Sequence, residues 1–243
     1  MKNEWFASWF DTSYYHTLYQ DRDEKEAKSF IENLITNLDI PKGASLLDLA
    51  CGKGRHSITL NELGYNVLGV DLSSNSISIA SEFSTKNLTF AVHDMREKIE
   101  GKSFAAIFNL FTSFGYFDEE SDNLSVLNSV NSMLDENGLL VIDFMNANRV
   151  VSTLVESELK HVDGIDFNIV RRYDGKHIYK EIEFSDDGND FHFTERVQAL
   201  SFDTFEKLLK KAGFRILRTF GDFDLSPFDI VKSNRLILIA QKV

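Results

Sequence analysis

The middle of the chain alternates short apolar runs with segments of helical spacing, and this alternation restricts the fold more than any other feature. The apolar runs are 45–50, 66–72, 88–94, 103–111 and 139–146. The segments with helical spacing are 56–63, 74–84 and 123–138, the last ending in Asn-Gly. Strands alternating with helices form βαβ units, and strands buried on both faces of a parallel sheet are nearly continuous in apolar residues. The sequence therefore predicts an α/β fold with a doubly wound, mostly parallel sheet.

After about residue 160 the pattern changes, and polar residues alternate with β-branched and aromatic ones. Three such segments, 165–173, 177–184 and 191–200, are separated by turn signals that contain Asp-Gly. They predict a small antiparallel β insertion. A capped helix over 201–213 and two closing strands, 214–222 and 234–243, follow it.

This pattern suggests a division of the chain into two parts. We assign residues 1–150 and 201–243 to one domain with an N-terminal helical cap, which includes a helix over 23–38. Residues 151–200 form the insertion, which we expect to serve as a lid over a pocket or as a dimer contact.

The stretch LLDLACGKGRHS, residues 46–57, places an acid and two glycines at a corner between a strand and a helix. Gly52 and Gly54 lack a Cβ, so a ligand can approach the backbone closely, near the positive end of the next helix. Dinucleotide sites carry a third glycine where Ser57 stands here. Asp48 would repel a pyrophosphate but would suit an ammonium or a sulfonium. The corner thus predicts a site for a small charged cofactor, with a purely structural turn as the alternative.

Two further acids follow later strands of the predicted sheet. Asp71 lies about twenty residues beyond the glycines, where such folds place a carboxylate on a ribose diol. A helix N-cap or a solvated loop is the alternative for this acid. Asp94 and Met95 end the third strand, where a carboxylate can accept from the amine of a base and a thioether can pack on its face. Ordinary core packing is the alternative for Met95.

Composition excludes several classes of function. The formal net charge of −12 disfavours nucleic acid as a partner, since phosphate binding depends on basic groups. No apolar run is long enough for a membrane span, and the first fifteen residues do not resemble a secretory signal, so we expect a cytoplasmic protein. Cys51 is the only cysteine, and the six histidines show no paired spacing. We therefore expect neither a disulfide nor a metal site.

Four stretches, LLDLACGKGRHS, GVDLS, HDMRE and FNLFTSFGYF, resemble in order and spacing the motifs of class I S-adenosylmethionine-dependent methyltransferases. The resemblance covers about residues 40–146 and the last 30. It implies S-adenosyl-L-methionine as the cofactor and a Rossmann-like, seven-stranded sheet whose last strand is antiparallel. The cofactor-binding residues that it implies are Asp48, Ala50, Cys51, Gly52, Gly54, Arg55, Asp71, Leu72, Ser73, Asp94, Met95, Asn109 and Leu110.

The resemblance also distributes roles among these residues. The glycine corner would line the methionine part, Asp71 would bind the ribose, and Leu72 would pack on the adenine. Asp94 and Met95 would take the adenine as well. Asn109 and Leu110 would flank the methionine amine.

A narrower likeness is to bacterial small-molecule N-methyltransferases, including enzymes that dimethylate amino sugars. It implies methyl transfer to a small molecule, preferably at an amine nitrogen, by in-line displacement supported by proximity and the exclusion of water. Two alternatives remain: an O-methyltransferase, and a protein that binds the cofactor without turnover. A nicotinamide-dependent oxidoreductase is disfavoured by Asp48 and Ser57. The oligomeric state is expected to be a monomer or a homodimer.

No catalytic constellation stands out, so the acceptor-side residues are candidates chosen by position: Tyr14, Tyr19, Phe114 and Tyr116, with Tyr15, His16 and Phe111 beside them. Aromatic faces of this kind can shelter an amine or a cation. The alternatives are core packing for the phenylalanines and a surface helix for the N-terminal tyrosines. Arg55 and His56 are expected to support the loop or to contact the cofactor carboxylate. Asp143 and Asn146 can orient a substrate or cap the next element.

Overall fold

The computed structural model describes residues 9–19 and 24–243. Its main sheet has seven strands in the order β10-β11-β5-β4-β1-β2-β3, and β11 is antiparallel to both of its neighbours. The predicted seven-stranded sheet with an antiparallel last strand is therefore confirmed. The strands are β1 (Ser45–Leu49), β2 (Asn66–Asp71), β3 (Leu88–Val92), β4 (Phe104–Asn109), β5 (Leu134–Met145), β10 (Phe214–Phe220) and β11 (Arg235–Lys242).

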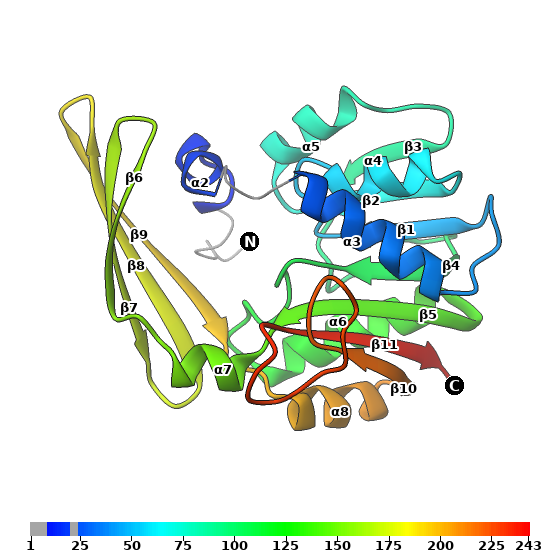
Figure 1. Ribbon diagram of the computed structural model, residues 1–243. Coiled ribbons are helices and arrows are strands. Elements are labelled where there is room, and N and C mark those ends of the chain that lie inside the picture. Colours follow the sequence, from blue (N-terminus) through cyan, green and yellow to red (C-terminus); the bar gives the residue numbers. More distant parts are fainter. Residues whose placement is uncertain (1–8, 20–23) are drawn as a thin grey trace.

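Helices cover both faces of this sheet, because neighbouring apolar residues of its strands point to opposite sides. Leu46 packs with the core beneath helices α3 (Glu24–Asn37) and α4 (Arg55–Glu62), whereas Leu47 packs with the core on the other side. Helices α6 (Glu120–Met133) and α8 (Phe202–Lys211) cover that second face, and α5 (Ser74–Ser81) packs against β2 and β3. Figure 1 shows this layered arrangement.

One predicted helix boundary is wrong. The helix expected to run to Gly138 ends at Met133, and β5 begins at the next residue. Leu134 already pairs with Phe104, while Leu139 pairs with Ala106, so residues 135–138 form a bulge within the strand. The Asn-Gly turn signal is real, since Asn137 has a φ of +60°, but it serves this bulge rather than a helix end.

The β insertion before the sixth strand of the main sheet is confirmed as a separate antiparallel sheet in the order β6-β7-β8-β9. Its strands are β6 (Ser157–Val162), β7 (Ile165–Tyr173), β8 (His177–Asp186) and β9 (Asn189–Gln198). The sequence did not predict β6, because only Val162 of that strand is buried and the apolar alternation is weak. Helix α7 (Ala147–Ser152), which leads into the insertion, was not predicted either.

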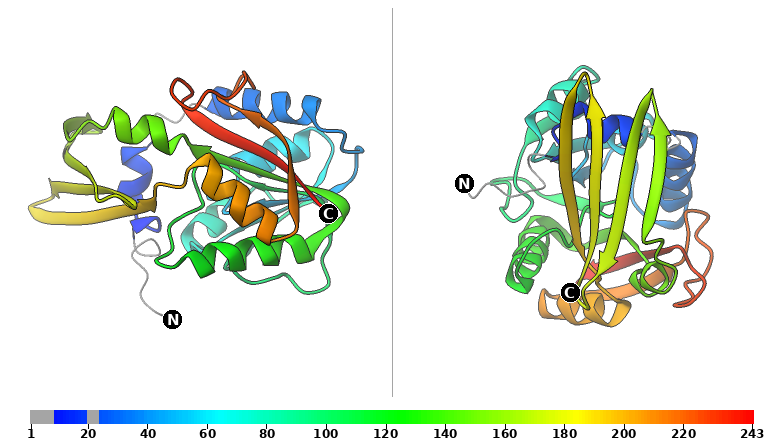
Figure 2. Two further views of the ribbon diagram at one scale, coloured as in Figure 1. Left: turned by 90° about the horizontal axis from the view of Figure 1, so that it is seen from below. Right: turned by 90° about the vertical axis from the view of Figure 1, so that its left-hand side faces the viewer.

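The four-stranded sheet stands across the carboxyl ends of the parallel strands, and helix α2 (Ser13–Leu18) lies between the two sheets (Figures 1 and 2). Trp9 and Leu18 are almost fully buried in a core shared with Phe167 and Ile182 of the four-stranded sheet. The inner face of the insertion thus has its own apolar core, built with the N-terminal segment. Within the described residues, no helix has both the length and the apolar character needed to span a membrane.

Candidate active site

A cavity of about 440 Å³ opens at the carboxyl edge of the main sheet, beneath α2. Ligands bind at this edge in open α/β sheets, because loops and helix N-termini converge there. The cavity is lined by residues of the strand ends, the N-terminal segment and the loop after β4: Phe10, Tyr15, His16, Tyr19, Ala50, Cys51, Gly52, Lys53, Arg55, His56, Asp71, Leu72, Ser76, His93, Asp94, Met95, Leu110, Phe111, Ser113, Tyr116 and Phe117.

The two glycines of the corner do different work. Gly52 has a φ of +55°, and a Cβ placed on it would meet no atom within 4 Å, so its backbone is open to the cavity. Gly54 has a φ of +84° and is the N-cap of α4. A Cβ on Gly54 would lie 2.7 Å from the ring of Phe90, so this glycine is needed for packing behind the turn.

Asp71 braces the glycine turn from the end of β2. One carboxylate oxygen accepts from the Gly52 N–H at 2.8 Å, and the other accepts from the Ser73 N–H at 2.8 Å. Burial raises the pKa of Asp71, and the backbone donors of Ser73 and Gly52 oppose that shift. The carboxylate lines the cavity and has further lone pairs for a ligand hydroxyl.

Asp94 lies at the same edge and is held by Arg96. The guanidinium contacts both carboxylate oxygens, with the shortest distance, 2.6 Å, from Nη2 to Oδ2. Burial would raise the pKa of Asp94, but the hydrogen bond and charge of Arg96 outweigh it, and the net shift of the pKa is downward. Asp94 and Met95 both line the cavity, where an ionised acceptor and an apolar surface lie side by side.

Asp48 does not line the cavity, although the sequence places it at the strand end. It is 1% exposed, and its Oδ2 accepts from the Ser57 hydroxyl at 2.5 Å. Burial raises the pKa of Asp48 from 3.8 to about 6, against the effect of the Ser57 hydrogen bond. The acid therefore lies behind the glycine turn rather than in the cavity wall.

This shifted pKa predicts a pH-dependent stability. A carboxyl whose pKa is raised on folding stabilises the fold below its ordinary pKa, and this contribution is lost as pH rises through the raised value. The difference of about two units corresponds to roughly 3 kcal/mol. Asp48→Asn keeps an acceptor for Ser57 but cannot ionise. We expect its free energy of unfolding to rise relative to that of the wild type by about this amount between pH 4 and pH 7.5. Urea unfolding at both pH values measures it, and an unchanged difference would contradict it.

The end of β4 supplies one unpartnered polar atom. The Asn109 amide donates to the Leu49 carbonyl at 3.0 Å, while its buried Oδ1 has no hydrogen-bond partner among the described residues. The next loop carries Phe111 with a φ of +63°, and its ring lies 4.2 Å from the Arg55 guanidinium carbon. Strain of this kind clusters at ligand sites, where the surrounding structure holds it in place.

The N-terminal segment closes the cavity from the side of the four-stranded sheet. Glu195 of β9 accepts from the Trp9 indole at 2.7 Å and from the Tyr19 hydroxyl at 2.7 Å. On the opposite side, Asp11 accepts from the Ser73 hydroxyl at 2.5 Å, at the start of α5. The segment therefore bridges the insertion and the main sheet, and Tyr19 and Phe10 become part of the cavity wall.

The structure brings most of the predicted site residues together. Those that line the cavity are Ala50, Cys51, Gly52, Arg55, Asp71, Leu72, Asp94, Met95 and Leu110, with the acceptor-side candidates Tyr19 and Tyr116. Those that do not line it are Asp48, Gly54, Ser73, Asn109, Tyr14 and Phe114. Ser73 caps α5, and its hydroxyl accepts from the Ser76 N–H.

The two remaining acceptor-side candidates have structural environments. Tyr14 donates to Asp186 at 2.9 Å and packs against Phe184 on the insertion. Phe114 is 1% exposed and packs against Phe205 in the main core. Residues 1–8 and 20–23 of the expected N-terminal helical cap lie outside the described residues.

The strand-end residues Asp143 and Asn146 also have structural partners. Asp143 pairs with Arg235 and accepts from the Phe111 N–H. Asn146 donates to the carbonyls of Ile230 and Ser233 and so holds the loop before β11.

Sequence reasoning missed six lining residues: Phe10, Lys53, Ser76, His93, Ser113 and Phe117. Lys53, His93, Ser113 and Phe117 lie inside the quoted motifs, so considering every position of each motif would have found them. Phe10 has no local signal, because its place in the wall depends on where α2 packs. Cys51 is buried, and burial raises the pKa of its thiol, which fits an inert residue of the turn.

The cavity fits the S-adenosylmethionine that the resemblance implies. Asp71 and Asp94 offer acceptors for hydroxyl and amine donors, and Leu72 and Met95 add an apolar surface to the same cavity. Among the residues that the structure describes, no group of three or more His, Cys, Asp or Glu side chains is arranged to hold a metal ion.

Comparisons with known proteins agree with this geometry. The family profile described as "Methyltransferase domain" matches residues 40–186. A solved S-adenosylmethionine-dependent methyltransferase from Clostridium acetobutylicum ATCC 824 superposes with a TM-score of 0.80 at 20% identity, over 94% of this chain and 96% of that one.

Two curated relatives carry more specific names. A glycine/sarcosine N-methyltransferase of Aphanothece halophytica is 29% identical over 217 residues, which is 83% of this chain and 76% of the relative. A dTDP-3-amino-3,6-dideoxy-alpha-D-glucopyranose N,N-dimethyltransferase of Streptomyces fradiae is 31% identical over 105 residues, 42% of this chain and 40% of the relative.

Proposed function

From the premise that this chain belongs to the methyltransferase-domain family, as a class I S-adenosylmethionine-dependent enzyme, we propose that it methylates an amine nitrogen of a small molecule. The observation that carries this proposal is the roofed cavity of about 440 Å³, whose wall toward the insertion is aromatic. A cavity closed by α2 has room for a small acceptor beside the cofactor. Its rings suit an amine that becomes a cation on methylation.

The aromatic wall is a continuous cluster. The Phe10 ring lies 4.9 Å from that of Tyr15 and 5.3 Å from that of Tyr116, and Tyr15 lies 4.9 Å from Tyr19. The bound cofactor supplies a methyl group already activated by a sulfonium. The protein therefore has to align the acceptor, shelter it from water and stabilise the ammonium that forms. Aromatic faces meet the last two needs.

The cofactor contacts are proposed from position. Asp71 would hold the ribose, Asp94 the adenine amine, and Leu72 and Met95 the faces of the adenine. Leu110, which lines the cavity beside the buried Asn109, would flank the methionine amine. Asp48, behind the turn, would favour the sulfonium through its charge.

The insertion is proposed as the lid of this site. Support comes from the hydrogen bonds of Trp9 and Tyr19 to Glu195, which join the N-terminal segment over the cavity, residues 9–19, to β9. Two relatives are named as N-methyltransferases, one of glycine and sarcosine and the other of an amino sugar. These names support nitrogen as the acceptor atom. The net charge of −12 supports a small molecule over nucleic acid.

The test is a paired acceptor screen with S-adenosylmethionine, followed by mass spectrometry of products and S-adenosylhomocysteine. Each small amine, including glycine, sarcosine and 3-amino sugar nucleotides, is paired with its hydroxyl analogue, and protein and RNA serve as further acceptors. We expect methylated product from an amine and not from its hydroxyl partner. Tyr116→Phe should keep this activity, and Tyr116→Leu should lower kcat/KM about ten-fold through loss of the ring.

Other results would contradict the proposal. Product from the hydroxyl compounds alone would make this an O-methyltransferase. Cofactor binding without product from any acceptor would favour a non-catalytic binding protein. Product from RNA or protein alone would exclude the small-molecule class.

A further inference from the structure

Asp11 joins the N-terminal segment, residues 9–19, to the start of helix α5. Its Oδ1 atom accepts from the Ser73 hydroxyl at 2.5 Å and from the Asn75 N–H at 3.2 Å. Its main-chain carbonyl accepts from the Asn75 side-chain amide at 3.3 Å. Asp11 does not line the cavity, whereas the preceding residue, Phe10, does. The proposed contacts therefore give this acid no role, although it is tied to a turn beside the site.

The hydrogen bonds of Asp11 complete the N-terminal cap of α5. The first N–H groups of a helix have no partner within the helix. Ser73 is the N-cap, and its hydroxyl oxygen accepts from the Ser76 N–H at 2.9 Å. Asp11 accepts the proton of the same hydroxyl and the Asn75 N–H, and a negative charge is favourable at this end of a helix. The cap thus includes an acid that lies 62 residues away from Ser73 in the sequence.

The residue that Asp11 holds is also held by Asp71. The Ser73 N–H donates to Asp71 Oδ1 at 2.8 Å, while the Ser73 hydroxyl donates to Asp11. Asp71 is the last residue of β2 and lines the cavity. A displacement of Asp11 would therefore pass through a single residue to a backbone donor of Asp71. Ser73 connects the N-terminal segment to the carboxylate that we place on the ribose.

The two carboxylates that share Ser73 repel each other. Burial raises the pKa of Asp71, the N–H groups of Ser73 and Gly52 oppose that shift, and the charge of Asp11 raises the pKa further. Ribose hydroxyls that donate to Asp71 would stabilise its charged form and offset this repulsion. Coupling between two contacts is reciprocal, so a contact of Asp11 that ligand binding favours will itself favour ligand binding.

The N-terminal segment is anchored on its other side, in the insertion. Trp9 and Leu18 are buried in the apolar core of the four-stranded sheet. Helix α2, which is part of this segment, lies between the two sheets (Figure 1). Asp11 fixes the anchored segment relative to the main sheet, and with it the position of the wall residue Phe10.

We propose that Asp11 is a positioning residue of the cofactor site, which holds Ser73 and so fixes both the segment over the cavity and the turn that presents Asp71. Asp11 itself does not touch the ligand. This role rests on the proposed contact between Asp71 and the ribose, and it is independent of which acceptor is methylated.

The experiment measures the affinity for S-adenosylhomocysteine by calorimetry in Asp11→Ala, Asp11→Asn, Ser73→Ala and the double variant of Asp11→Ala with Ser73→Ala. Asp11→Ala should weaken binding about ten-fold through loss of the hydrogen bonds to a charged group. Asp11→Asn keeps an oxygen for the Ser73 hydroxyl and the Asn75 N–H, so it should restore most of the affinity. The double variant should bind about as well as the weaker single variant, because both substitutions break the same link.

A second measurement follows the release of labelled S-adenosylmethionine during a chase with unlabelled cofactor, in the absence of any acceptor. Release from Asp11→Ala should be about ten-fold faster with little change in the association rate, since the segment covers the bound ligand. Tyr14→Phe is the matched control. It removes a hydrogen bond of the same segment to Asp186 of the insertion, and it should change neither the affinity nor the release rate.

Three results would overturn this role of Asp11: an affinity of Asp11→Ala within about two-fold of wild type, an Asp11→Asn variant as weak as Asp11→Ala, or additive losses in the double variant. Asp71→Ala separates this failure from that of the proposed ribose contact. Normal binding by Asp71→Ala would remove that contact and with it the role of Asp11. Weak binding by Asp71→Ala with normal binding by Asp11→Ala would overturn the role of Asp11 alone.

Discussion

Replacing Asp71 with alanine is expected to weaken the binding of S-adenosylhomocysteine by roughly 100-fold or more. The carboxylate has two connections within the protein, to the N–H groups of Gly52 and Ser73, both at 2.8 Å. Its loss removes the proposed ribose acceptor and leaves the glycine turn without its brace. Each hydrogen bond from a ribose hydroxyl to the charged carboxylate contributes about 1.5–3 kcal/mol. Two such bonds, one from each hydroxyl, account for the expected loss of affinity.

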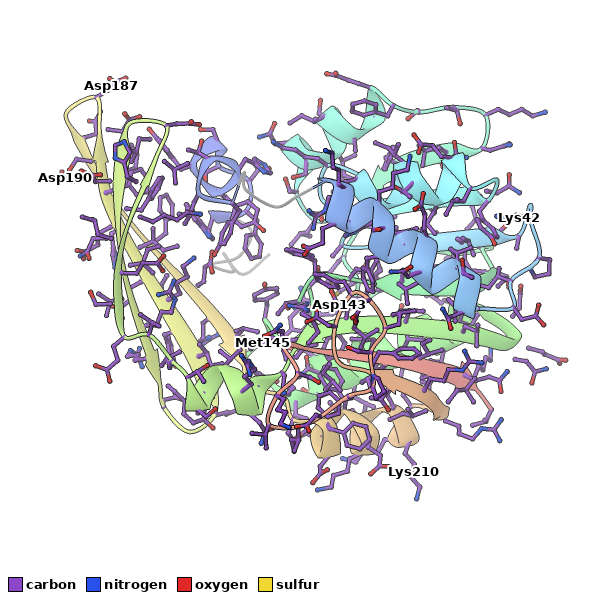
Figure 3. All side chains as sticks on the ribbon, viewed as in Figure 1. Lys42, Asp143, Met145, Asp187, Asp190 and Lys210 are labelled. Atoms are coloured by element: carbon purple, nitrogen blue, oxygen red, sulfur yellow. The ribbon has the colours of Figure 1, made fainter. Side chains whose placement is uncertain are left out.

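Calorimetric titration of wild type and variant measures this effect. Asp71→Asn keeps one carbonyl oxygen, so its affinity for S-adenosylhomocysteine should lie between those of the wild type and Asp71→Ala. Asp190→Ala is the matched control, since this acid lies at the tip of the β8–β9 hairpin, far from the cavity (Figure 3), and its removal should not change the affinity. A folded Asp71→Ala protein that binds S-adenosylhomocysteine within three-fold of wild type would remove Asp71 from the site.

The parallel sheet and the cofactor edge could be predicted because their causes are local. Strands buried on both faces must be apolar throughout. Asp71 ends β2, and Asp94 follows the end of the edge strand β3 by two residues. The same rule gives the position of Asp48 but not its surroundings. Its burial behind the turn depends on Ser57 of α4 and cannot be recognised from the spacing of acids.

The packing of the N-terminal segment, residues 9–19, over the cavity could not be predicted in detail, because its contacts are with distant parts of the chain. Trp9 reaches Glu195, which is 186 residues away, and nothing in either segment marks the pair. The same separation along the sequence explains why Tyr14, a predicted acceptor-side residue, does not line the cavity. Tyr14 lies in α2 and Tyr19 is the C-cap of the same short helix, yet Tyr14 faces Asp186 on the insertion and only Tyr19 of the two reaches the cavity. A sequence pattern shows that a segment is aromatic, whereas tertiary packing decides which ring lines the site.

The second large effect is expected from Asp143→Ala, which should lower the free energy of unfolding by about 3–5 kcal/mol. Asp143 is fully buried at the end of β5 that faces the insertion (Figure 3). It accepts from Arg235 Nε at 2.8 Å and from the Phe111 N–H at 2.8 Å. Its removal leaves the largely buried Arg235 side chain without its carboxylate, and breaking such a pair costs far more than the pair itself contributes.

The substitution should also disturb the cavity wall, because Asp143 holds the loop after β4. In that loop Phe111 and Thr112 both have positive φ values, +63° and +59°. Backbone in this region is maintained only by its surroundings. Urea unfolding of Asp143→Ala, Arg235→Ala and the double variant should show that the double loss is smaller than the sum of the single losses, since no unpaired charge remains in it. Additive losses, or a single loss below about 1 kcal/mol, would show that the pair does not hold the loop. If it does, the same variant should bind S-adenosylhomocysteine more weakly, because Phe111 and its partner Arg55 stand in the cavity wall.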